Sequence, residues 1–76
     1  MRRLFFDVFT AEGFLYDYEG RVFRRDEDAR KLAELIALDL EATDATAWAG
    51  SAVEIRDGDG KKLFSILVQK SDRVAA

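Results

Sequence analysis

Only one segment of this chain has the apolar periodicity of an α-helix, and the other apolar segments alternate as strands do. The helical segment spans residues 27–43, where small and aliphatic side chains recur at helical spacing. Asp26 suits the N-cap position, because its carboxylate can accept hydrogen bonds from the free N–H groups of the first turn. No clear stop signal follows before Gly50, so the end of the helix stays open. A single helix covers only one face of a sheet, which restricts the architectures that remain.

The remaining apolar segments lie on both sides of this helix. Extended segments are expected at residues 4–9, 14–17, 21–23, 52–57 and 61–69. Gly13 falls in the first connecting turn and Asp57-Gly58-Asp59-Gly60 in the second, where Gly and Asp supply the positive φ angles of tight hairpins. We therefore predict an α+β fold: a four-stranded antiparallel sheet with one helix packed on one face, in the order ββαββ. It forms a single domain over residues 1–70, followed by a loose tail at 71–76.

The alternation of side chains gives the sheet two faces that both carry apolar residues. If Gly58 and Asp59 form a two-residue loop, Val53 lies opposite Phe64, and one face of this hairpin is apolar throughout. The face against the helix is expected to contain Leu4, Phe6, Val8, Val53, Ile55, Phe64, Ile66 and Val68. The opposite face carries further large apolar side chains without cover from the helix, namely Phe5, Phe9, Leu15, Leu63 and Leu67.

These five residues form a candidate interface. Contiguous exposed apolar patches of more than a few hundred Å² are rare on monomers and mark binding surfaces. We therefore expect a homodimer through this sheet face, or another protein docked on it. Two alternatives stay open. Scattered apolar groups are normal on protein surfaces, and the segment around Trp48, residues 42–51, can fold over this face.

The chain lacks the residue types on which most catalytic and metal sites depend. It has no cysteine and no histidine, which excludes disulfides and the usual zinc sites. Its serines therefore lack the usual activating base, and no glycine-rich phosphate loop leads into the helix. The Asp57-Gly58-Asp59-Gly60 turn starts like a calcium loop, but Lys61 and Lys62 stand where a ligand and a glycine belong. We predict no enzymatic activity, no catalytic residue, no cofactor and no metal.

Charge and hydropathy limit the partners and the location. The net charge is −3 and the sequence pI is about 4.8, so the chain lacks the bulk positive potential that drives nucleic-acid binding. Basic residues near Phe5 and Phe9 keep a weak nucleic-acid binder as an alternative, because aromatic side chains on a sheet can stack on bases. No stretch approaches the ~20 apolar residues of a membrane span. Asp7 interrupts the apolar run after Met1-Arg2-Arg3, unlike a signal peptide. We expect a cytoplasmic protein.

Several local patterns together resemble one known family. They are the opening Arg3-Leu4-Phe5-Phe6-Asp7-Val8, the Asp17-Tyr18-Glu19-Gly20 turn, the Ala-rich helix after Asp26, and Val53-Glu54-Ile55-Arg56-Asp57-Gly58-Asp59-Gly60-Lys61. This combination resembles a family of short bacterial proteins that is catalogued only as a domain of unknown function. The resemblance covers nearly the whole chain and implies the strand–strand–helix–strand–strand layout. It implies no activity, substrate or cofactor.

A second similarity is to the antitoxins that neutralise small RNA-cleaving toxins of the double-stranded-RNA-binding-domain shape. Their N-terminal part also runs strand, acid–glycine turn, strand, and an Ala- and Glu-rich helix. An acidic protein that masks a basic toxin is electrostatically reasonable. The leading hypothesis is nevertheless a non-enzymatic interaction module that self-associates through the uncovered sheet face, with an antitoxin-like inhibitor or a weak nucleic-acid binder as alternatives.

Overall fold

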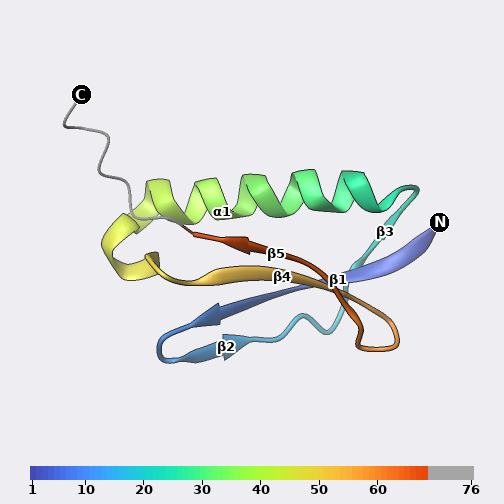
Figure 1. Cartoon of the computed structure of the whole chain (residues 1–76), viewed down its shortest axis with the longest axis horizontal. Coiled ribbons are helices and arrows are strands. Elements are labelled where there is room, and N and C mark those ends of the chain that lie inside the picture. Colours follow the sequence, from blue (N-terminus) through green and yellow to red (C-terminus); the bar gives the residue numbers. More distant parts are fainter. Residues whose placement is uncertain (69–76) are drawn as a thin grey trace.

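An antiparallel sheet and one long helix make up the fold in a computed structural model, which describes residues 1–68 (Figure 1). The elements are β1 Arg2–Thr10, β2 Gly13–Leu15, β3 Arg21–Phe23, α1 Asp26–Trp48, β4 Ala52–Asp57 and β5 Lys62–Leu67. The predicted α+β class and the strand–strand–helix–strand–strand layout are confirmed. The predicted tail at 71–76 lies outside the described residues.

The sheet has the order β2-β1-β4-β5, and all neighbouring strands are antiparallel. The short piece β3 pairs with β1 as a fifth strand. Since β4 occupies one side of β1, β2 and β3 lie along its other side, where β2 pairs with Val8–Thr10 and β3 with Arg2–Leu4. Residues 16–20 connect these two pieces and pass the middle of β1.

The helix packs on one face of the sheet, mainly over β4 and β5 (Figure 1). Its buried stripe consists of alanines, which allow the helix to approach the sheet closely. The fully or nearly fully buried apolar residues are Leu4, Ala29, Ala33, Ala37, Val53, Ile55 and Val68. The strand β2 is at the edge of the sheet farthest from β5, so most of the helix does not reach over it (Figure 1). Among residues 1–68, no helix combines the length and the apolar character that a membrane crossing needs.

The helix extends beyond its predicted end but changes direction there. Asp44 has extended backbone angles (φ −159°, ψ 88°), so the segment up to Thr43 and the last turn are two helical pieces joined at a kink. The carboxylate of Asp44 accepts a hydrogen bond from Ala47 N at 3.0 Å, as an N-cap residue does. The sequence predicts Asp26 as the N-cap of the first piece, and the helix begins at this residue. Its carboxylate accepts hydrogen bonds from the guanidinium of Arg2.

The pairing predicted for the second hairpin is wrong by two residues. Val53 pairs with Ile66, and Phe64 pairs with Ile55. The turn is longer than two residues because Asp57 organises it: its backbone N–H donates to Lys61 O, and its carboxylate accepts from Asp59 N and Lys61 N. A shift of two residues leaves the same side chains on the apolar face. The residues predicted for that face therefore stay on it, although their partners differ. A register irregularity at the start of β5 accompanies the longer turn.

Candidate functional site

The sheet face opposite α1 is not covered by any described element, and we call it the open face. The strands β1 and β4 place alternate residues on it, since side chains of a strand point to opposite faces in turn. Its side chains are Phe5, Asp7 and Phe9 of β1, Phe14 of β2, Glu54 and Arg56 of β4, and Ser65 and Leu67 of β5. Tyr16 and Tyr18 extend it beyond the end of β2.

Four aromatic rings follow one another across this face, and we call them the aromatic row: Phe9, Phe14, Tyr16 and Tyr18. The Phe9 and Phe14 rings stack with their centroids 5.1 Å apart, because these residues are direct partners in the first hairpin. Tyr16 contacts Phe14 at 6.1 Å and Tyr18 at 4.8 Å. The four residues are 39%, 56%, 45% and 83% exposed. The row is therefore a continuous aromatic surface in contact with solvent.

A nearly buried ion pair lies beneath the aromatic row. The guanidinium of Arg56 donates from Nε to Asp7 Oδ2 at 2.8 Å, and the two side chains are only 15% and 5% exposed. The same guanidinium lies 4.0 Å from the ring centroid of Tyr16 and 4.6 Å from that of Phe5. Such cation–π contacts strengthen when they are shielded from water. Arg56 therefore joins β1, β4 and the segment after β2 in one rigid unit.

Asp17 fixes the backbone of that segment. Its carboxylate accepts hydrogen bonds from Phe6 N, Glu19 N and Gly20 N, each at 3.0 Å. Partial burial alone raises the pKa of Asp17, but these three donors and the charge of Arg56 outweigh it, so the pKa lies below its ordinary value of 3.8. The Asp17 N–H donates to Asp7 Oδ1, and the Asp17 carbonyl accepts from Arg56 Nη2 at 2.7 Å. The loop acid thus has a structural role.

The four charged groups at the centre of the open face are paired with one another. Besides Asp7 and Arg56, Lys62 Nζ lies 3.2 Å from Glu54 Oε1, and Ser65 Oγ lies 3.4 Å from Glu54 Oε2. The four charged groups and three rings of the row, those of Phe9, Phe14 and Tyr16, line a shallow hollow of about 440 Å³. Within residues 1–68, no three acidic side chains gather closely enough to hold a metal ion.

The five residues of the candidate interface fall into three groups. Phe9 and Leu67 lie on the open face and are 39% and 57% exposed. Phe5 also belongs to this face but is half-buried, since Arg56 covers its ring. The other two residues, Leu15 and Leu63, do not belong to the open face.

Leu15 and Leu63 do not lie on the sheet face to which the sequence assigned them, while the interface itself stays a prediction. The first hairpin has a two-residue turn that pairs Val8 with Leu15, so Leu15 shares the helix side of the sheet with Val8. Leu63 stands at the register irregularity of β5 and packs against the buried core. Strict alternation cannot place either residue without knowledge of the turn length and of the irregularity.

Most of the site lies in residues that periodicity did not select. Phe14, Tyr16 and Tyr18 form three of the four rings of the row, and Asp7 with Arg56 anchors it. One available signal was the alternation of aromatic residues through residues 14–18. Another was the pair of opposite charges placed in the middle of two otherwise apolar strands.

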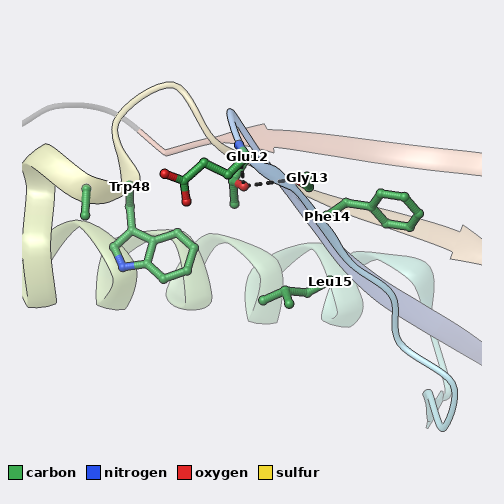
Figure 2. A pocket seen from close by; sticks show the side chains of 7 residues that line it. Glu12, Gly13, Phe14, Leu15 and Trp48 are labelled. Atoms are coloured by element: carbon green, nitrogen blue, oxygen red, sulfur yellow. Dashed lines mark hydrogen bonds between the residues drawn. The ribbon is translucent and has the colours of Figure 1, made fainter.

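The segment around Trp48 does not cover the open face. It forms the last turn of α1, and Trp48 packs against the buried core on the helix side. There, Trp48 lines a second hollow of about 400 Å³ with the tip of the first hairpin (Figure 2). We call it the hairpin hollow, and its walls are Thr10, Glu12, Gly13, Phe14, Leu15, Ala47 and Trp48.

A comparison with protein-family models matches residues 3–69 to a domain of unknown function, DUF6894. The chain belongs to the DUF6894 family. The matched range contains all but the first residue of β1 and all of the later elements, so the open face and the hairpin hollow are both features of this DUF6894 domain. No curated protein and no solved structure matches the chain. The open face and the hairpin hollow of this DUF6894 domain are therefore the basis for its proposed function.

Proposed function

We propose that this DUF6894 domain is a non-enzymatic protein-interaction module that forms a homodimer through its open face. The aromatic row is the observation that carries the proposal. Exposed Tyr and Phe side chains supply large contact areas at a small cost in side-chain entropy. Such residues are enriched in the centres of protein interfaces, where charged residues are depleted.

The paired charges favour a second copy over the alternative partners. Asp7 with Arg56 and Glu54 with Lys62 neutralise one another, so a partner does not have to bring compensating charge to the centre of this face. A basic toxin or a nucleic acid gains affinity from uncompensated charge of the opposite sign. A second open face has the same neutral, aromatic character, and a two-fold axis brings identical patches together.

The ion pair beneath the row also supports a binding role. Rigid interface residues lose less conformational entropy on binding, so preorganised surfaces bind more tightly. Arg56 holds Tyr16 from below, and Asp17 holds the backbone on which Tyr16 and Tyr18 stand. The row is thus ordered before a partner arrives.

The test is the solution mass of the purified protein, measured by light scattering after size exclusion over a range of concentrations. Phe14→Glu places a charge in the middle of the aromatic row. Leu38→Glu is the matched control, since Leu38 on α1 is 57% exposed and Phe14 is 56% exposed. Phe5→Glu is a poorer probe, because it also removes the surface on which Arg56 rests.

The proposal predicts a dimer for the wild type and for Leu38→Glu, and a monomer for Phe14→Glu. A wild-type monomer at every concentration would contradict it. In that case, co-purification of a small basic protein supports the antitoxin-like alternative. Oligonucleotide binding that weakens steeply with salt supports the nucleic-acid alternative.

A further inference from the structure

The hairpin hollow lies at the end of the first hairpin, between its tip and the last turn of α1, and it shares only Phe14 with the hollow of the open face. The helix does not cover β2, but its last turn approaches the tip of the first hairpin (Figure 2). The space of about 400 Å³ that remains between them is within the range of small-ligand sites. Leu15, which is 60% exposed, and the indole of Trp48 form apolar walls on either side.

The polar group of this hollow is a carboxylate. The side chain of Glu12 extends from the hairpin turn toward the Trp48 side of the hollow (Figure 2). In the described part of the chain, Glu12 takes part in no ion pair, and the lining of the hollow contains no basic residue. The hydroxyl of Thr10 is already engaged, since it donates to Gly13 O and accepts from Glu12 N. Glu12 is therefore the group available to a ligand.

The last turn of α1 brings no compensating positive charge to this place. The last turn of α1 contains no basic residue, although a helix C-terminus favours cations. Asp44 stands at the start of the same turn, with its carboxylate on Ala47 N. A positive group at the Trp48 ring would thus interact with an indole and with the Glu12 carboxylate.

We propose that the hairpin hollow binds a small organic cation with an apolar body, such as an arylalkyl ammonium. The apolar body packs between Leu15 and Trp48, and the ammonium group faces Glu12. Phe14 borders both this hollow and the open face, but the groups that would hold the cation, Glu12, Leu15 and Trp48, are not among the open-face residues. Its occupation therefore does not require self-association.

Trp48 is the only tryptophan of the chain, so its fluorescence can be used to follow binding in the hairpin hollow. The experiment titrates phenethylammonium chloride into the full chain and follows the Trp48 fluorescence. Phenethyl alcohol, which has the same ring and chain without the charge, is the ligand control. Glu12→Gln removes the carboxylate charge, and Glu27→Gln at the far end of the helix is the matched protein control.

The proposal predicts a saturable signal with phenethylammonium and at least a severalfold weaker response to the alcohol. Glu12→Gln is expected to weaken the binding of the ammonium about three- to fivefold, and Glu27→Gln to leave it unchanged. Equal binding of the ammonium and the alcohol would overturn the proposal. A linear, unsaturable quench, or a Glu12→Gln variant with wild-type affinity, would overturn it as well.

Discussion

Arg56 has the largest number of distinct roles among the residues of the open face. It neutralises Asp7, donates to the Asp17 carbonyl and lies between the rings of Phe5 and Tyr16. Removal of one member of a buried ion pair leaves the other charge uncompensated, which is costly. The stability of the fold and the order of the aromatic row therefore depend on the same side chain.

The first prediction follows from this dependence. Arg56→Met leaves the nearly buried Asp7 without its cation and is expected to lower the free energy of unfolding by about 3 kcal/mol. A second substitution, Asp7→Leu, removes the uncompensated charge. The double variant should therefore lose less free energy of unfolding than the two single variants lose in sum. Urea denaturation of the four proteins at pH 7 measures this coupling. Additive effects would show that the pair is not coupled.

Asp17 makes the fold sensitive to acid. Its pKa in the folded chain is lowered, so the ionised carboxylate stabilises the fold above the ordinary value of 3.8. This stabilisation is lost as the pH falls through the folded-state pKa. The pKa of Asp57 is lowered too, by the backbone N–H of Lys61 first of all, despite a smaller opposing effect of burial. Both groups add to the loss of stability in acid.

The second prediction concerns this acid sensitivity. Asp17→Asn keeps a hydrogen-bond acceptor but loses the charge, and we expect about 1–2 kcal/mol lower stability at pH 7. Below pH 4 the difference from the wild type should shrink, and it should become smallest once the pH has fallen through the lowered folded-state pKa of Asp17, because the wild-type carboxyl is then protonated as well. Urea denaturation between pH 7 and pH 2.5 tests this. A difference that stays constant over this range would contradict the assigned role of the Asp17 charge, and Asp59→Asn in the exposed turn is the control.

The elements differ in how well the sequence predicted them. The helix, the strand Ala52–Asp57 and the apolar core follow from periodicity alone, because those segments alternate or recur without interruption. The positions of Leu15 and Leu63 depend on a turn length and on a register irregularity, which periodicity does not encode. The aromatic row depends on the path of residues 16–20, which Asp17 fixes through backbone hydrogen bonds.

The last turn of α1 depends on the capping residue Asp44. Asp44 starts the last turn, and this turn places Trp48 against the core and beside the hairpin hollow. The third prediction is that Asp44→Ala costs about 1 kcal/mol of stability, whereas Asp44→Asn, which also caps well, costs a few tenths. Thermal or urea unfolding measures the difference. Equal effects of the two substitutions would contradict the capping role.

At the scale of the whole molecule, one helix covers one face of a small sheet and leaves the other face exposed. The helix side contains the buried core, and the open face contains a neutral, preordered aromatic surface. Solvent exposure of four neighbouring rings is unfavourable for a monomer, and in the proposed homodimer a second copy would cover them without any change of fold. This is the physical basis of the proposed homodimer.

The most direct test of that claim is an isotope-filtered NOE measurement on a mixture of labelled and unlabelled chains. The account predicts intermolecular NOEs between ring protons of the aromatic row, with Phe14 and Tyr16 at the centre. NOEs that connect the chains through α1, or their absence in a sample shown to be dimeric, would contradict association through the open face.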